Sequence, residues 1–116
     1  MITKTDYFEF SGIDLDIDFK KSSSDNPSRA VEIFISRIEN WCMNYLKTYY
    51  FWDGETDDLE ADELAYYKQG LLHQIDYVRR HGDISISQNK ELPELAPNAK
   101  IQFRLAGLMN ANYGRW

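Results

Sequence analysis

The chain has 116 residues, of which 43% are hydrophobic and 15% aromatic, with a net charge of −6 and one cysteine, Cys42. This length fits a single domain with its own hydrophobic core, and the composition excludes a disordered chain. The acidic balance argues against a phosphate backbone as the main ligand, and a lone cysteine excludes an intramolecular disulfide and a cysteine zinc site.

The first residues of the chain predict a short helix followed by an extended segment. Thr3 or Thr5 can cap a helix that Gly12 ends in the left-handed conformation. From residue 13 to residue 19, apolar side chains alternate with aspartates, and this period of two predicts extended chain with one apolar face. Residues 20–26 are polar and rich in serine, which indicates a loop.

The first long helix is expected from Pro27 to about Trp52. Asn26 can cap this helix, and proline suits the first helical position. Asp53 and Gly54 are expected to end it. Its apolar side chains fall mostly three and four residues apart and predict one continuous stripe: Val31, Phe34, Ile35, Ile38, Trp41, Cys42, Tyr45, Leu46 and Tyr49.

The second long helix is expected to begin near Asp57, with Glu60 three residues later as in a capping box. Its inner stripe is Leu64, Tyr67, Leu71, Ile75 and Val78. Gly70 inside this helix costs about 1 kcal/mol relative to alanine. The cations of residues 79–81 suit the last turn, and Gly82 supplies a left-handed stop. The short acidic loop between the two long helices predicts an antiparallel pair.

The last part of the chain predicts a third helix after a loop. Residues 84–87 suit a short extended segment, and residues 88–97 contain two prolines and suit a loop. Pro97 is expected to begin a helix that continues to Met109. The inward residues of this helix are predicted to be Ile101, Leu105 and Leu108.

Together these segments predict a mainly α protein: a small helical bundle with two long antiparallel helices, a short N-terminal helix, a C-terminal helix and an extended C-terminal tail. Residues 1–109 are expected to form one helical domain, and residues 110–116 a docking tail. The opening residues lack a basic start followed by an apolar run, and no apolar stretch approaches ~18 residues. We therefore expect no signal peptide, no transmembrane helix and no membrane partner.

No pattern in the sequence indicates catalytic or metal chemistry. Residues 14–25 approximate a calcium loop but lack its glycine at the sixth position and its glutamate at the twelfth. The histidines, His73 and His81, lie about two helical turns apart, too far for paired metal ligation. Cys42 lies on the apolar stripe, which favours a buried structural thiol over a nucleophile. We expect no enzyme activity, no metal and no cofactor.

Aromatic residues gather at the end of the first long helix and near the start of the second. The first group is Tyr45, Tyr49, Tyr50, Phe51 and Trp52, and the second is Tyr66 and Tyr67. Antiparallel packing would bring the two groups to the same end of the helical pair. They belong either to the core or to a patch for another subunit, because tyrosine and tryptophan are enriched in interfaces.

The charges are distributed unevenly along the chain. Acids are dense between residues 53 and 63, and bases gather later, at Arg79, Arg80, Lys100, Arg104 and Arg115. This asymmetry suits head-to-tail contact between copies of the chain, while a soluble acidic surface is the simpler interpretation that stays open. The predicted subunit-contact residues are Arg79, Arg80, Asp57 and Asp58.

The tail carries the predicted partner-binding residues Tyr113, Arg115 and Trp116. A terminal segment frays unless it is tied down. An arginine and a tryptophan following a tyrosine make a poor sequence for a free tail and suit an anchor that docks into a pocket. That pocket belongs either to a partner or to the same chain.

Three segments, in this order, carry a resemblance to a known family. Residues 3–12 hold a tyrosine-bearing opening helix and a glycine, residues 74–83 hold Gln74 and Tyr77 before a glycine, and residues 97–108 begin with Pro-Asn-Ala. This order resembles the head–tail connector (adaptor) proteins of tailed bacteriophages. Residues 13–26 have no counterpart in that family.

The resemblance implies a mainly helical subunit that assembles as a ring, commonly of about twelve copies. Such a ring binds beneath the portal protein and joins it to the next neck or tail-completion protein, around a channel that DNA passes through without specific binding. C-terminal arms in the family often reach the portal, which implies that role for the tail. The chain is then expected in the virion neck, after assembly in the host cytoplasm.

Two further functions are compatible with the sequence. One is a small acidic inhibitor, such as an anti-defence or DNA-mimic protein, that binds a nucleic-acid-processing enzyme and needs its acids on one continuous face. The other is a small regulatory helical protein of a mobile element. A connector differs from both because it needs two distinct interfaces and a tail that orders on assembly.

Overall fold

The computed structural model describes residues 2–21, 26–81 and 95–109 of the chain. Within these ranges the protein is mainly helical and contains no strand, which confirms the predicted fold class. The helices are α1 (Lys4–Ser11), α2 (Leu15–Lys21), α3 (Pro27–Tyr50), the 3₁₀ turn η1 (Thr56–Asp58), α4 (Ala61–His81) and α6 (Pro97–Leu105).

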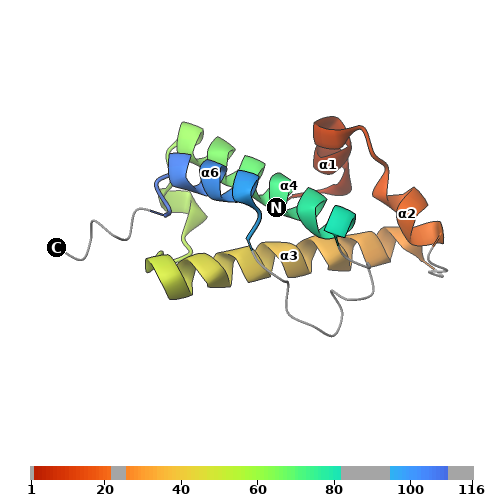
Figure 1. Ribbon diagram of the computed structural model, residues 1–116, viewed down its shortest axis with the longest axis horizontal. Helices are drawn as coiled ribbons and strands as arrows, with labels where there is room; N and C mark the ends of the chain where they lie inside the picture. Colours follow the sequence, from red (N-terminus) through yellow and green to blue (C-terminus); the bar gives the residue numbers. More distant parts are fainter. Residues whose placement is uncertain (1, 22–25, 82–94, 110–116) are drawn as a thin grey trace.

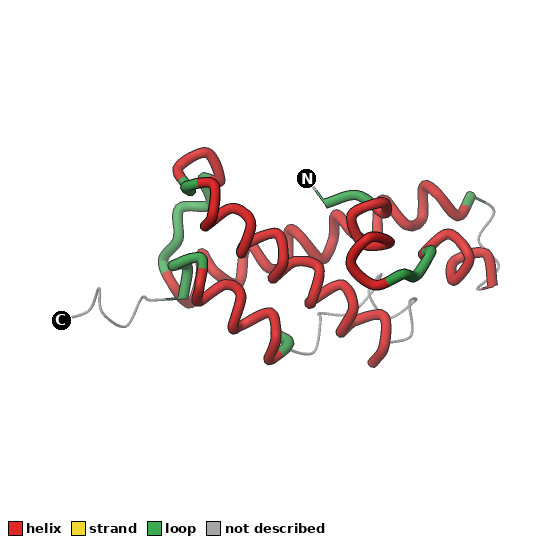
Figure 2. Tube along the Cα trace, turned by 90° about the horizontal axis from the view of Figure 1, so that it is seen from above, coloured by secondary structure: helices red, strands yellow, loops and turns green. Residues whose placement is uncertain are grey.

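The two longest helices, α3 and α4, run in opposite directions, as the sequence predicts (Figure 1). The most extensive packing, however, joins α4 to α6, and α3 packs more extensively against α2 than against α4. Seen from above, α4 lies between α6 on one side and α1 on the other (Figure 2). Helix α4 is therefore the element around which the rest of the fold is arranged.

Helix α1 begins and ends where its sequence predicts. The Thr3 hydroxyl accepts from the backbone N–H of Asp6 at 3.1 Å, and the Asp6 carboxylate accepts from the backbone N–H of Thr3 at 2.9 Å. This reciprocal pair is a capping box. Gly12 ends the helix at a φ of 76°, a left-handed conformation that glycine adopts without strain.

The predicted extended segment over residues 13–19 is wrong, because residues 15–21 form helix α2. The Asp14 carboxylate accepts from the backbone N–H of Asp16 at 2.9 Å and supports the first turn. Leu15 and Phe19 are four residues apart and lie buried together on one helical face, while Ile17 is exposed. A pattern that alternates every two residues also contains apolar residues four apart, which share one face of a helix. Packing against α3 favours the helix over the extended chain.

Helix α3 begins at Pro27, with the Asn26 side chain accepting from the backbone N–H of Arg29 at 3.2 Å, as predicted. It ends at Tyr50, earlier than Asp53 and Gly54. Phe51 adopts the left-handed conformation with a φ of 58°, and Phe51 rather than a glycine ends the helix.

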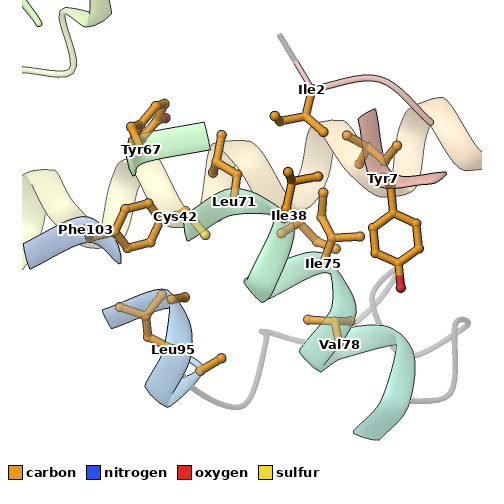
Figure 3. Close-up of a cluster of buried hydrophobic side chains, with 14 of the residues drawn as sticks. Ile2, Tyr7, Ile38, Cys42, Tyr67, Leu71, Ile75, Val78, Leu95 and Phe103 are labelled. Atoms are coloured by element: carbon orange, nitrogen blue, oxygen red, sulfur yellow. The ribbon is translucent and has the colours of Figure 1, made fainter. Parts of the chain in front are cut away.

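The stripe of α3 and that of α4 meet in one hydrophobic core (Figure 3). The buried residues of α3 are Val31, Phe34, Ile35, Ile38, Cys42 and Leu46, and those of α4 include Tyr67, Leu71, Ile75 and Val78. Cys42 is fully buried, as expected, and burial raises the pKa of its thiol. Tyr49, also expected on the stripe, is 62% exposed instead.

The start of α4 differs from the prediction. Residues 56–58 form the short turn η1, and α4 begins at Ala61 rather than near Asp57. The Glu63 side chain accepts from the backbone N–H of Glu60 at 2.9 Å, so the capping glutamate is three residues later than predicted. A run of acidic residues offers several candidate caps, and local sequence alone does not select among them.

The inward face of α6 also differs from the prediction. Ile101 and Leu105 are exposed, and Ala99 and Phe103 are buried in their place, although Leu108 is buried as expected. The reason is a close approach between α6 and α4: the Phe103 ring occupies the space where a Cβ atom of Gly70 would lie, only 2.5 Å from the nearest ring carbon. The helix ends at Leu105 rather than Met109.

Several predictions fall outside the described residues. These are the stop at Gly82, the extended segment 84–87, the loop 88–97 up to residue 94, and the tail 110–116. The predicted loop over residues 20–26 overlaps helix α2 at residues 20 and 21 and is otherwise undescribed up to residue 25.

Substituting alanine at the close approach should destabilise the protein. Gly70→Ala gains about 1 kcal/mol in helix propensity but forces the Phe103 ring to move, and overpacking costs about 1–3 kcal/mol. We expect a net loss in the free energy of unfolding, measured by urea denaturation. The control is Gln69→Ala on the exposed side of the same helix, which should stay within about 0.5 kcal/mol of the parent. A Gly70→Ala variant as stable as the parent would contradict the close approach.

Candidate functional site

Three segments that are distant in the sequence meet around the C-terminal half of α4. We call this place the junction and define it by Tyr7 of α1, Gln74, Asp76 and Arg79 of α4, and Ala96 immediately before α6. Each segment is one of the three that carry the family resemblance or directly adjoins it. The junction is therefore the candidate functional site.

Tyr7 fixes α1 onto α4 through its hydroxyl group. The hydroxyl donates to the Asp76 carboxylate at 2.7 Å and accepts from Nε of Arg79 at 2.7 Å. Burial, followed by the bond to Asp76, raises the pKa of Tyr7, so the phenol stays neutral and keeps its proton available for this bond. The ring lies in the hydrophobic core with Ile75 and Val78 (Figure 3). Its hydroxyl oxygen is the atom that bonds to the charged pair.

The two arginines predicted as subunit contacts have different surroundings. The Arg79 side chain is 20% exposed and is engaged with Tyr7 and with Asp76, whose carboxylate lies 3.6 Å from its guanidinium. The Arg80 side chain is 67% exposed, and its Nε lies 3.4 Å from Asp76. Arg79 therefore links α4 to α1, whereas the guanidinium of Arg80 is largely exposed to solvent.

Gln74 connects α4 to the start of α6. Its side chain is fully buried, and its Oε1 accepts from the backbone N–H of Ala96 at 2.7 Å. A buried amide without partners would cost about 1–3 kcal/mol, so this bond favours one position for the start of α6. Sequence periodicity gives no sign of this role, because a glutamine on a helix is usually exposed.

A hollow of about 290 Å³ lies beside the junction, between the end of α4 and the start of α6. It is lined by His73, Asp76, Tyr77, Arg80, Ala96, Pro97 and Asn98. The His73 ring contacts Phe10 edge-to-face, with 4.9 Å between ring centroids. Burial lowers the pKa of His73, so its imidazole is neutral at pH 7.

A second polar link joins the first three helices and has the composition of a serine–lysine pair. Nζ of Lys4 lies 3.0 Å from Oγ of Ser28 and 2.7 Å from the Asp16 carboxylate. The hydrogen bond to Asp16 raises the pKa of Lys4, so the ammonium keeps its proton and cannot act as the base that a serine nucleophile needs. The link is structural.

The predicted acidic contacts lie at the opposite end of α4 from Arg80. Asp57 and Asp58 are exposed on η1, just before the helix begins. Because α4 has 21 residues, its two ends are about 30 Å apart. No single copy can join these acids to Arg80, so any such pairing would be between copies.

The two aromatic groups meet, as the antiparallel arrangement predicts. Trp52 contacts Tyr67, and Tyr67 contacts Phe103, with ring centroids 5.2 and 5.8 Å apart. Tyr49, Phe51 and Tyr66 remain exposed at the same end. Trp52 and Tyr67 therefore pack in or against the core, and the exposed members stay candidates for the predicted patch.

The remaining predicted site residues, Tyr113, Arg115 and Trp116, lie outside the described residues. Within the described ranges, no group of three or more His, Cys, Asp or Glu residues could hold a metal ion. No helix in those ranges is both long and apolar enough to cross a membrane.

No protein-family model matches the chain, and no curated protein or solved structure shows significant similarity to it.

Removing the Tyr7 hydroxyl should loosen the attachment of α1. Tyr7→Phe leaves the buried ring in place but deletes both bonds to the charged pair, and hydrogen bonds to charged groups contribute about 1.5–3 kcal/mol. We expect a loss of that size in the free energy of unfolding. Tyr49→Phe, at an exposed position, is the control. Equal stability of the two variants would mean that the arginines alone satisfy Asp76.

The neutral His73 should make stability fall in acid. Its pKa is lower in the folded state than the ordinary 6.5, so below pH 6.5 the unfolded chain binds more protons, and unfolding becomes easier as the pH falls. We expect His73→Gln to lose less stability than the parent between pH 7 and pH 5, measured by urea denaturation at each pH. Parallel curves for the two proteins would contradict a half-buried neutral imidazole.

Proposed function

We propose that this chain is a structural adaptor in the neck of a tailed bacteriophage. Copies of it form a ring that joins the portal protein to the next neck or tail-completion protein around the DNA channel. The work of the protein is assembly and docking, with no catalysis. Its place is the virion neck, reached after assembly in the host cytoplasm.

The observation that carries this proposal is the convergence of the three family-like segments at the junction. Tyr7 of the first segment donates to Asp76 of the second, and Gln74 of the second accepts from Ala96, which directly precedes the third. A structural unit built from the three segments requires such contacts. Their contact supports the interpretation that they belong to one inherited structural unit.

The charge distribution supports the self-association that a ring requires. Acidic side chains are exposed on η1, and Arg80 is exposed about 30 Å away at the other end of α4. Opposite charges at two separate places on one subunit favour a head-to-tail contact, and a head-to-tail contact that closes produces a ring. A net charge of −6 suits a channel through which DNA slides without binding.

A second candidate, the acidic inhibitor of a nucleic-acid-processing enzyme, is favoured by one observation. The acids near the start of α4 are exposed as a group: Asp53, Glu55, Asp57, Asp58, Glu60 and Asp62. Such a group attracts a basic protein surface. An inhibitor of this kind would bind a host nuclease tightly at low salt, with an affinity that falls as salt rises.

Imaging the purified chain with portal rings tests the adaptor proposal. We expect a symmetric ring stacked on the portal in averaged electron micrographs. Deleting residues 110–116 should leave the far-ultraviolet circular dichroism spectrum unchanged and weaken portal binding, because the tail is the proposed docking arm.

Two results would contradict this account. An absence of portal binding at high protein concentration, together with tight and salt-sensitive binding to a host nuclease, would favour the inhibitor. Unfolding of the truncated chain would mean that the tail belongs to the core rather than to a docking arm.

A further inference from the structure

Two parts of the described surface expose apolar side chains that the fold leaves uncovered. The first, which we call the aromatic end, is Tyr49, Phe51 and Tyr66, at the turn where α3 ends and α4 begins. The second, which we call the α6 outer face, is Ile101 and Leu105 with Lys100 and Arg104 beside them. Ile101 and Leu105 are one helical turn apart and form a continuous apolar strip.

The two surfaces carry opposite charge. The aromatic end is bordered by the exposed carboxylates of residues 53–62. On the α6 outer face, Lys100 and Arg104 form a cationic row parallel to the strip of Ile101 and Leu105, because both pairs are four residues apart. The two surfaces are therefore complementary: each has apolar side chains to bury against the other, and the acidic border of one faces the cationic border of the other.

Phe51 is a bulky, exposed aromatic residue at a helix end where glycine is favoured. A left-handed φ of 58° is strained for a bulky residue, and glycine or asparagine would end the helix without that strain. The left-handed conformation ends α3 with a backbone bond to the Leu46 carbonyl, but the Phe51 side chain itself is 72% exposed and gains little packing within the described chain. Strained residues of this kind concentrate at functional sites.

The charges alone are too weak to hold copies together. Exposed ion pairs contribute little to binding and are screened by salt, so a contact resting on acids and Arg80 would be marginal. Stable interfaces place aromatic anchors at a desolvated centre and charges at the rim. The aromatic end and the α6 outer face supply this arrangement on two different parts of the same chain.

We propose that the aromatic end of one copy packs against the α6 outer face of a second copy, with Phe51 lying on the strip of Ile101 and Leu105. The carboxylates around Phe51 then face Lys100 and Arg104 of the neighbour. The contact joins two different surfaces, so its repetition is head-to-tail, and it builds a ring when the rotation between copies closes. This inference rests on the proposed ring-forming function and specifies which surfaces form it.

Self-association of the purified full chain, followed by sedimentation velocity over a range of concentrations, tests the contact. The parent should associate, and Phe51→Gly should raise the dissociation constant at least tenfold while raising the melting temperature by about 5 °C, because glycine relieves the strain. Phe8→Ser, at another exposed apolar position, is the matched control and should leave association unchanged. A parent that is monomeric at about 1 mM, or a Phe51→Gly variant that associates normally, overturns the proposal.

Charge reversal tests the pairing directly. Arg104→Glu alone and the double variant Asp57→Arg/Asp58→Arg alone should each be largely monomeric, because like charges then meet across the contact. Mixing the two variants in equal amounts should restore association in alternating copies, since every contact between one variant and the other again joins opposite charges. Failure of the mixture to associate overturns the pairing even if each variant loses association.

The adaptor proposal and this contact fail in different experiments. A chain that associates through these surfaces but ignores portal rings would overturn the adaptor proposal and leave the contact intact. A chain that stacks on portal rings while Phe51→Gly and Arg104→Glu have no effect on ring formation would overturn the contact alone.

Discussion

The close approach of α6 to α4 at Gly70 is the constraint on which the surface of this protein depends. The Phe103 ring lies in the space that any larger residue at position 70 would fill, and it also contacts Tyr67. Seating Phe103 there fixes the rotation of α6, with Ala99 inward and Ile101 outward. The same seating brings the backbone N–H of Ala96 onto the buried Gln74. One missing side chain thus determines both the Gln74–Ala96 bond of the junction and the apolar strip.

Directional polar bonds, more than apolar area, fix the N-terminal helix. Within α1 itself only Tyr7 is buried, yet polar links reach all of its neighbours: the Ile2 backbone to Glu39, Lys4 to Asp16 and Ser28, and Tyr7 to Asp76. These hydrogen bonds have strict geometry, so they select one orientation of α1, whereas apolar contacts would allow several. This attachment of α1 has a desolvation cost, because Oδ1 of Asp16 is buried without a hydrogen-bond partner among the described residues.

Some features set by neighbouring residues could be predicted from the sequence, although the start of α4 could not, and most features set by distant contacts could not. The cap at Asn26 and the stop at Gly12 depend on local chemistry, and both are where the sequence places them. Helix α2 and the face of α6 depend on packing against other helices, and both predictions fail there. The junction is similar: Tyr7 and Asp76 are 69 residues apart, and no periodicity pairs them.

The single cysteine of the chain can report on opening of the hydrophobic core. Cys42 is the sole thiol in the chain and is fully buried between the long helices, with a pKa raised by that burial. A thiol reagent therefore reacts only when the core opens, and the labelling rate reports the frequency of that opening. Any ligand or partner that stabilised the long helices would slow the labelling, so its binding could be followed at Cys42 without an engineered label.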